Sequence, residues 1–384
     1  MQTGQLTRLV KQQAHQQGFS LVGITTPDSP AHFGVFEGWL AQDRHGEMRY
    51  LETARARLRR RDPKQILPEC RSILVLGIRY PSPGAQQEAY SVQDARPVGK
   101  VAAYAWNDDY HDVLPERLQA IVAFIEARVG EPLPNRWYTD TGPILERDLA
   151  QRAGLGWIGK NTCLIHPNKG SYFLLAEILL GIDLEPDEPF QADRCGSCTR
   201  CLEACPTGCI LPDRTLDARH CISYLTIELK GAIPAHLRPQ MQDWVFGCDI
   251  CQQVCPWNLR FASPQGDAAF APRPDVPAPD LIPELSLSTQ EFNRKFKGSP
   301  VKRAKRRGYL RNVAVALGNA GNAQAVPALV QALKDVEPLV RGHTAWALGR
   351  IGGPVARKTL EQAYHSESDA DVREEIRAAL DGFE

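Results

Sequence analysis

Two short cysteine runs constrain the fold of this 384-residue chain more than any other feature. The first is Cys195-x2-Cys198-x2-Cys201-x3-Cys205-Pro206, and the second is Cys248-x2-Cys251-x3-Cys255-Pro256. The first spacing is the pattern in which three thiolates surround one 4Fe–4S cluster and the fourth, placed before a proline, binds a second cluster. The segment must therefore fold around two clusters that share ligands crosswise, and electron transfer is the first function that the sequence indicates.

The second run lacks a leading cysteine, so one ligand must come from elsewhere. The spacing assigns Cys195, Cys198, Cys201 and Cys255 to the first cluster, and Cys205, Cys248, Cys251 and one further thiolate to the second. Cys209 and Cys221 are the candidates for that thiolate. Cys209 follows Cys205 so closely that wrapping one cluster is awkward, whereas Cys221 lies on a separate segment. We favour Cys221, although spacing alone does not exclude Cys209.

Other uses of the cysteines are less well supported. Paired CxxC motifs also bind zinc, but a four-cysteine run that ends in proline has no use in a tetrahedral zinc site. A disulfide framework is not expected, because a chain of this length needs no covalent staples. Cys70 and Cys163 stand alone in apolar surroundings, so we expect them to be small buried hydrophobic residues.

The composition is that of an ordinary globular chain, with 43% hydrophobic and 23% charged residues and room for two or three domains. Residues 1–20 predict an amphipathic helix and contain neither the apolar segment of a secretory signal nor a twin-arginine pair. No apolar run is long enough to cross a bilayer. We therefore expect a cytoplasmic protein with no membrane partner.

Strand-like and helix-like patterns alternate over the first 190 residues. The expected strands are 72–80, 135–139 and 172–180, the last with an apolar helix as its alternative, and the expected helices are 111–129 and 146–153. This alternation indicates an α/β (α+β) domain. Residues 261–283 are rich in proline and alanine and mark a boundary. The expected division is a catalytic domain (1–185), a ferredoxin-like two-cluster domain (186–260), a linker (261–290) and a helical repeat (291–384).

The expected repeat rests on three similar segments. Leu310-Arg311, Val340-Arg341 and Val372-Arg373 are each followed by an Ala-Leu pair and recur about every 31 residues. Such units form HEAT-like stacks of helix pairs whose concave faces bind extended partners. The alternative is a plain helical bundle that packs on the catalytic domain.

Charge is concentrated where the repeat begins. The chain has a net charge of zero, yet residues 294–311 contain nine basic residues and no acidic one. A stretch of that kind suits contacts with nucleic-acid phosphates. Its alternative is a solvated basic helix face.

Three features of the first domain resemble parts of a site. Asp140 ends an expected strand before a Gly-Pro turn, where it could bind a ligand or simply cap the next helix. Gly154, Gly156 and Gly159 match the letters of a dinucleotide motif, but they follow a helical pattern; we expect them to let the backbone approach a flat cofactor. The arginine triplet 59–61 precedes Asp-Pro and is most often surface charge.

Five motifs in order resemble the epoxyqueuosine reductase family. They are YTDTGP, GLGWIGKNT, CGSCTRCLEACPT, CDICQQVCPWN and the basic GSPVKRAKRRGYLRN that leads into the repeats, and together they span nearly the whole chain. The resemblance implies a cobalamin-dependent enzyme with two 4Fe–4S clusters, related to reductive dehalogenases. It implies reduction of the epoxide of epoxyqueuosine at the tRNA wobble position.

The resemblance also implies roles for single residues. The proton donor of the family corresponds to Asp140, and the eighth cluster ligand to Cys221. The implied corrin contacts are Arg60, Tyr104, Asp140, Lys160, Asn161 and, as an addition, Ser171. The implied tRNA contacts are Lys302, Arg303, Lys305, Arg306, Arg307 and Arg311.

These roles combine into one chemical expectation. Electrons from an external low-potential donor pass through the clusters to the corrin, and Asp140 protonates the departing oxygen. Because a free aspartic acid has a pKa of about 3.9, burial against corrin or substrate would have to raise the pKa of Asp140. The base is expected to be turned out of the tRNA anticodon loop. A substrate of this kind requires no second subunit, so a monomer is expected.

Two rival functions remain at this point. A respiratory reductive dehalogenase would share the cofactors but would need an export signal and would have no use for a basic repeat domain. A non-catalytic iron–sulfur electron-transfer adaptor would dock partners through the repeat and bind no corrin.

Overall fold

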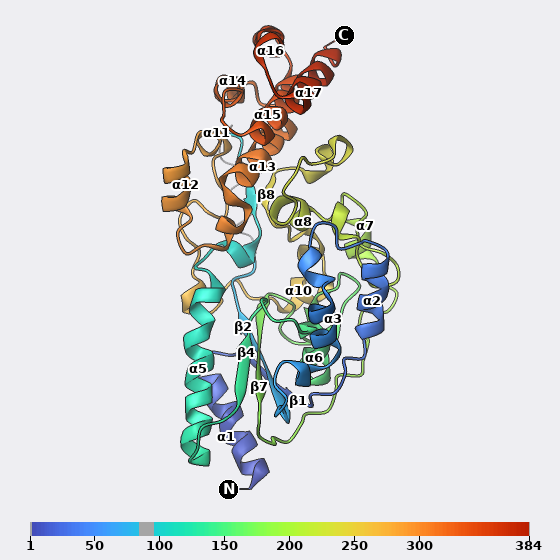
Figure 1. Ribbon diagram of the computed structural model, residues 1–384, viewed down its shortest axis with the longest axis vertical. Coiled ribbons are helices and arrows are strands. Elements are labelled where there is room, and N and C mark those ends of the chain that lie inside the picture. The colour runs from blue at the N-terminus through green and yellow to red at the C-terminus, as the bar shows by residue number, and fades with distance from the viewer. Residues whose placement is uncertain (1, 84–95, 384) are drawn as a thin grey trace. The chain divides into compact units, whose positions relative to one another are not determined.

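The computed structural model describes residues 2–83 and 96–383 of the chain. The chain forms two compact units, each built from three separate segments (Figure 1). Unit 1 consists of Met1–Ser82, Asp108–Arg219 and Ile250–Ala271, and unit 2 of Pro83–Asn107, His220–Asp249 and Pro272–Glu384. One boundary, after Ala271, falls inside the expected linker. The division into four domains stays a prediction.

Unit 1 is built on a four-stranded sheet with the strand order β1-β2-β7-β4. Its strands are β1 (Leu21–Thr25), β2 (Ser72–Arg79), β7 (Phe173–Leu180) and β4 (Asn135–Tyr138). All the expected strands are thus present, and residues 172–180 form a strand rather than a helix. Every neighbouring pair is antiparallel, so the strand-end rule for parallel sheets does not place Asp140.

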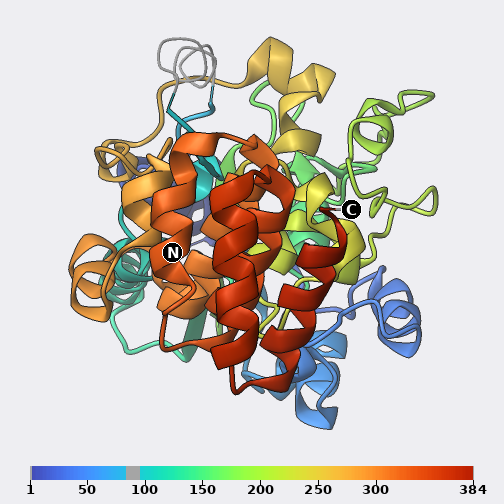
Figure 2. The same cartoon turned by 90° about the horizontal axis from the view of Figure 1, so that it is seen from above.

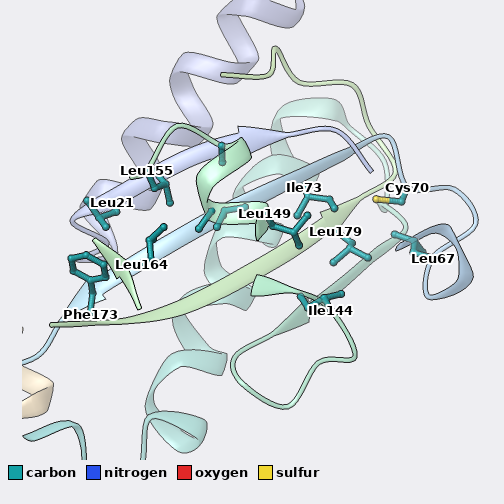
Figure 3. Packing of buried hydrophobic residues seen from close by; sticks show 13 residues of the cluster. Leu21, Leu67, Cys70, Ile73, Ile144, Leu149, Leu155, Leu164, Phe173 and Leu179 are labelled. Carbon is teal, nitrogen blue, oxygen red and sulfur yellow. The ribbon is translucent and has the colours of Figure 1, made fainter. Parts of the chain in front are cut away.

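Helices cover both faces of this sheet (Figure 1). α1 (Thr3–Gln16) and α5 (Tyr110–Val129) pack together, and α5 also contacts β4 and β7. α6 (Glu146–Arg152) contacts β1, β2 and β7. Because side chains alternate along a strand, Ile73 of β2 and Leu179 of β7 reach the face on which Leu149 of α6 packs (Figure 3). The expected helices 111–129 and 146–153 are confirmed.

Shorter elements complete unit 1. Its remaining helices are α2 (Phe33–Ala41), α3 (Ala54–Arg61), α7 (Arg200–Glu203), α9 (Ile250–Gln253) and α10 (Pro256–Phe261). A small hairpin pairs β5 (Trp157–Ile158) with β6 (Leu164–Ile165). Cysteines of both runs lie on or beside α7, α9 and α10.

Unit 2 is mainly helical. β3 (Lys100–Val101) pairs in parallel with β8 (Trp244–Phe246), beside α8 (Ile222–Ile227). The helices that follow are α11 (Leu281–Leu285), α12 (Thr289–Lys295), α13 (Lys305–Ala320), α14 (Val326–Ala332), α15 (Pro338–Ile351), α16 (Pro354–Ser366) and α17 (Ala370–Asp381). α13 packs on α15 and α15 on α17, so alternate helices form one layer (Figure 2, orange to red).

Candidate active site and iron–sulfur centre

Asp140 lies in the loop between β4 and α6, and its carboxyl is accessible. Its backbone is left-handed (φ 57°), a conformation that aspartate tolerates better than most residues. Tyr110 donates its hydroxyl to Oδ2 at 2.9 Å, and His111 Nε2 lies 3.8 Å from the same oxygen. The Asp140 side chain is 60% exposed. A ligand can therefore reach a carboxyl that two α5 side chains hold in place.

Asp140 does not cap a helix. α6 begins at Glu146, its N-cap is Leu145, and no side chain caps it. Instead, the Asp140 backbone N–H donates to Glu146 Oε1 at 2.7 Å. The alternative that Asp140 caps the next helix is therefore wrong. Glu146, the first residue of α6, instead holds the Asp140 loop through this hydrogen bond.

Two further acids lie near Asp140, the buried Glu177 and the partly buried Glu146, and the sequence motifs did not indicate them. Glu177 of β7 is 0% exposed. Burial, with smaller effects from the charges of Glu146 and Asp140, raises its pKa well above the usual value. Burial and the charge of Asp140 raise the pKa of Glu146 to about 7. The available signal was a single acid within the apolar strand sequence FLLAEILL.

Arg60 belongs to the same neighbourhood. It lies on α3, is buried, and packs its guanidinium over the Phe36 ring at 5.5 Å. Burial lowers the pKa of Arg60, while the charges of Tyr50 and Glu146 oppose that shift. Unit 1 thus brings Arg60 and Asp140 together through Glu146.

The other expected corrin contacts lie elsewhere. Lys160 Nζ donates to the carbonyls of Gly196 and Cys198 in the first cysteine run, at 2.8 and 3.0 Å. Asn161 Nδ2 donates to the Cys251 carbonyl at 3.4 Å in the second run. Tyr104 belongs to unit 2, where its ring lies 6.3 Å from that of Phe246.

Ser171 also supports the cluster domain. Its hydroxyl oxygen accepts hydrogen bonds from Gln252 Nε2 at 3.0 Å and Asn258 Nδ2 at 2.9 Å. Gln252 directly follows Cys251 of the second run, and Asn258 lies on α10, the helix that begins just after Cys255. The loop before β7 is therefore fastened to that run.

The glycine run serves the protein's own packing. A Cβ at Gly156 would lie 2.1 Å from the Ile165 carbonyl oxygen, and one at Gly154 would lie 2.8 Å from that of Glu188. At Gly159 a Cβ would lie 2.6 Å from Ile165 Cδ1. The packing of the neighbouring chain therefore already requires these glycines, and the expectation that they admit a flat cofactor stays a prediction.

The first cluster's expected ligands gather in unit 1. Cys195 and Cys255 pack in one apolar cluster around Trp157, whose Nε1 donates to Cys195 Sγ at 3.4 Å. Burial, together with the charges of Cys195, Cys255 and Cys198, raises the pKa of Cys201 to about 11. The four thiols are thus close enough for their charges to affect one another. Bound iron would reverse this effect, because a metal stabilises thiolates.

The second cluster's expected ligands are divided between the units. Cys205 and Cys251 belong to unit 1, and Cys221 and Cys248 to unit 2. The buried Cys209 lies with its Sγ 3.4 Å from Cys205 Sγ, and this hydrogen bond is the main reason why the pKa of Cys205 falls to about 5. The choice of Cys221 over Cys209 stays a prediction.

The lone cysteines differ in their surroundings. Cys70 is 2% exposed, and burial raises the pKa of its thiol to about 11. It therefore behaves as the expected small hydrophobic residue. Cys163 is only partly buried.

The basic segment of unit 2 contains both structural and exposed residues. Arg311 is 0% exposed and donates to the carbonyls of Leu225, Leu229 and Gly231 at 2.5 to 2.9 Å. This placement contradicts the expected tRNA contact for Arg311. Its role is structural.

The other basic side chains lie at the surface to different degrees. Arg306 forms a two-pronged ion pair with Asp335, and Arg303 pairs with Glu228. Lys302, Lys305 and Arg307 are exposed. Among the six expected tRNA contacts, only these three have guanidinium or ammonium groups without a hydrogen bond or ion pair to residues 2–83 and 96–383.

Family models match three parts of the chain. They are described as a 4Fe-4S double cluster binding domain (residues 194–258), Epoxyqueuosine reductase QueG, DUF1730 (residues 60–141) and HEAT repeats (residues 305–381). The first match confirms the prediction of two 4Fe–4S clusters rather than a zinc site, and the third match confirms the helical repeat. The second match is consistent with cobalamin as a cofactor. No helix in the described ranges is long and apolar enough to cross a membrane.

Curated proteins similar to this chain carry one name. The epoxyqueuosine reductases of Salmonella typhimurium and Escherichia coli are 39% and 38% identical, over 90% of this chain and 88% and 89% of theirs. That of Pseudomonas aeruginosa is 40% identical over 90% of this chain and 95% of its own length.

Solved structures agree with these relatives. A selenomethionine-labelled epoxyqueuosine reductase has a TM-score of 0.88 at 33% identity and covers 99% of both chains. An epoxyqueuosine reductase with an epoxyqueuosine-modified tRNA-Tyr stem loop has a TM-score of 0.87 at 33% identity, also over 99% of both chains. The chain therefore belongs to the epoxyqueuosine reductase family.

Proposed function

We propose that this chain reduces epoxyqueuosine to queuosine at the wobble position of tRNA. The observation that carries the proposal is similarity over about nine-tenths of the chain to epoxyqueuosine reductases, one of them solved with a modified tRNA stem loop. The reaction breaks both C–O bonds of the epoxide, forms a C=C bond, takes up two electrons and two protons, and releases water. The protein must therefore supply electrons, protons and a place for the base.

Asp140 is the proposed proton donor. Its exposed carboxyl can meet a bound base, and the Tyr110 hydroxyl and the Glu146 carboxyl hold its side chain and backbone respectively. A related structure from Bacillus subtilis has its catalytic aspartate loop swung out of the active site. A loop held by a few hydrogen bonds suits such movement.

The residues proposed to hold cobalamin still have donors to offer. An ammonium group has three donors, a side-chain amide two and a hydroxyl one. Within the described part of the chain, Lys160 uses two, Asn161 uses one, and Ser171 only accepts. Each keeps one donor for an amide carbonyl of the corrin periphery, so the set fits. Arg60, Tyr104 and Asp140 complete the proposal, and bound cobalamin would supply a redox-active cobalt.

The two clusters would carry electrons inward from an external low-potential donor. Their cysteine ligands are those expected from the spacing, with Cys221 as the eighth. Hydrogen bonds to the ligand sulfurs tune cluster potentials, and Trp157 provides one to Cys195. The enzyme is proposed to work as a monomer in the cytoplasm, where its tRNA substrate is found.

The proposed tRNA contacts are the exposed members of the basic segment. Lys302 lies on the 3₁₀ turn Pro300–Ala304, and Arg307 lies in the first turn of α13. Lys305 between them has φ 58° and ψ 163°, a strained conformation that is almost restricted to glycine and that is typical of functional sites. α13 has no capping side chain and no acid in its first turn, so its N–H groups also favour a phosphate. Arg303 and Arg306 could also contact tRNA if each exchanged its carboxylate partner for a phosphate group.

The test is turnover of epoxyqueuosine-containing tRNA under anaerobic reducing conditions, followed by mass spectrometry of the nucleosides. Wild-type enzyme should convert the base with loss of one oxygen atom. Asp140→Ala should keep iron and cobalamin and lose about 10²-fold or more in rate, the usual contribution of a general acid. Full activity of Asp140→Ala would remove the assignment, and an inactive wild type with both cofactors bound would remove the function.

A further inference from the structure

An open hollow lies on unit 1 among the short helices that carry the two cysteine runs. Its walls come from α7, α9 and α10, and α7 packs against α9. The hollow has a volume of about 510 Å³ and is lined by Arg200, Glu203, Ala204, Gln253, Val254 and Leu259. All of these residues belong to unit 1, so the lining lies within one compact body.

The lining residues are chain neighbours of expected ligands of both clusters. Three of them directly precede a cysteine, in the pairs Arg200-Cys201, Ala204-Cys205 and Val254-Cys255. The spacing assigns the first and third of these cysteines to one cluster and the second to the other. A molecule seated in the hollow would therefore contact chain that is next to ligands of both clusters. Because electron transfer slows steeply with distance, the hollow is a favourable place for an electron donor.

The hollow offers apolar contacts to a partner. Leu259 of α10 is 68% exposed, and the partly buried Ala204 and Val254 extend the apolar lining. A single exposed leucine is ordinary on a protein surface. Here it borders a hollow between two helices, which is the setting in which a partner's side chain can be buried on binding.

Positive charge predominates beside the hollow. The cysteine runs and their helices, residues 194–205 and 250–261, contain three arginines and a single acid, Glu203. The three arginines are all exposed: Arg194, which packs over the Trp257 ring of α10, Arg200 and Arg260. Clusters bound by thiolates are anionic, so these arginines would also offset the repulsion that an acidic partner meets there. The charge of the surface therefore complements an acidic protein.

We propose that this hollow is the docking surface for an acidic protein that carries one electron at a time. The inference rests on the proposed function, which needs an external donor. In each encounter the reduced carrier loses one electron and one cluster gains it, with no bond made and no proton transferred. Two encounters supply the two electrons of one epoxide reduction. Complexes of this kind bury little surface and dissociate readily, which suits a small apolar hollow with a charged rim.

Stopped-flow kinetics test the surface in the holoenzyme, with reduced plant-type ferredoxin as the acidic carrier. Reduction of the wild-type clusters should slow as salt rises, because opposite charges steer the encounter. Arg200→Glu/Arg260→Glu should lower the second-order rate constant about tenfold or more. Photoreduced deazariboflavin, a small neutral reductant, should reduce the clusters of this variant as fast as those of wild type.

The matched control for charge is Arg8→Glu/Arg136→Glu. Both arginines are exposed on unit 1 outside the cysteine runs. The control changes the net charge by the same amount, and ferredoxin should reduce it at the wild-type rate.

Leu259→Ala separates docking from any electrostatic effect on the clusters. It removes an apolar contact without changing a charge, so the cluster potentials should stay at their wild-type values. The affinity for oxidised ferredoxin, measured by calorimetry, should fall about fivefold. Val355→Ala truncates a similarly exposed side chain of unit 2, 63% exposed, and should bind ferredoxin like wild type.

Three results would overturn the docking surface. The first is wild-type ferredoxin kinetics and affinity in both groove variants. The second is weaker tRNA binding with unchanged reduction by ferredoxin, which would assign the surface to tRNA. The third is a wild-type enzyme that deazariboflavin reduces and ferredoxin does not. Failure of the proposed function differs from all three, because ferredoxin would then reduce the clusters and no queuosine would form.

Discussion

At the residue scale, hydrogen bonds decide what each predicted side chain does. Motif spacing identified the cysteines because cluster ligands must recur at fixed intervals. It could not reveal that Lys160 donates to carbonyls of the first cysteine run, or that Glu146 holds the Asp140 backbone. Those contacts join residues of different loops and depend on the tertiary fold. Glu177 left a visible trace as one acid in an apolar strand.

Trp157 should tune the first cluster. Its indole N–H donates to Cys195 Sγ, and a donor to sulfur favours the reduced, more negative cluster. Trp157→Phe should therefore make the potential of that cluster more negative by about 40 mV, the one-electron equivalent of about 1 kcal/mol. A redox titration followed by electron paramagnetic resonance measures the shift.

Trp257→Phe is the matched control for that titration. Trp257 packs edge-on against Trp157 with centroids 5.1 Å apart, but its N–H donates to the Arg194 carbonyl rather than to sulfur. Trp257→Phe should therefore leave the reduction potential of the first cluster unchanged. Equal shifts in the two variants would mean that aromatic packing, and not the hydrogen bond, sets the potential.

At the element scale, the strands and helices that periodicity predicted are present, whereas short elements such as β1 and α2 were not predicted. Residues 72–80, 135–139 and 172–180 form strands, and the helical stretches begin within one or two residues of their expected starts. Charge density predicted less well. Arg311 and Lys302 carry the same charge in one basic segment, yet α13 buries the first and the preceding turn exposes the second. Packing in the folded protein decides which of the two side chains is buried, and charge density in the sequence does not reveal it.

The exposed basic residues should contact tRNA phosphates. Lys302→Glu/Arg307→Glu should weaken tRNA binding and reduce the slope of log K against log salt by about 1.5, as expected for two lost contacts. Filter binding at several salt concentrations measures the slope. Reduction of a minimal epoxide substrate should be unchanged.

The control variant Lys334→Glu/Lys358→Glu changes the net charge of the chain by the same amount as Lys302→Glu/Arg307→Glu. Both lysines are exposed in unit 2, outside the basic segment. This variant should keep the wild-type salt slope. Identical slopes in both double variants would show that overall charge, and not the turn before α13, determines the affinity.

At the scale of the whole molecule, chain order does not follow the compact units. The sequence suggested consecutive domains, because composition changes at the proline-rich segment and at the repeats. In the structure each unit collects three segments, and the second cysteine run itself is divided, with Cys248 in unit 2 and Cys251 in unit 1. Local patterns carry no information about such assembly. The order of the motifs nevertheless identified the family, because a motif can be recognised in the sequence even where the boundaries of the compact units cannot.

The central claim is that electrons delivered through the clusters reduce an epoxide that Asp140 protonates. Its most direct test is anaerobic titration of enzyme and epoxyqueuosine-containing tRNA with a reductant of known concentration, counting the queuosine formed. The account predicts one queuosine for every two electrons consumed in wild type, and almost none in Asp140→Ala although its clusters become reduced. Queuosine formation by Asp140→Ala at the wild-type rate, or reduced wild-type clusters that form no queuosine, would contradict it.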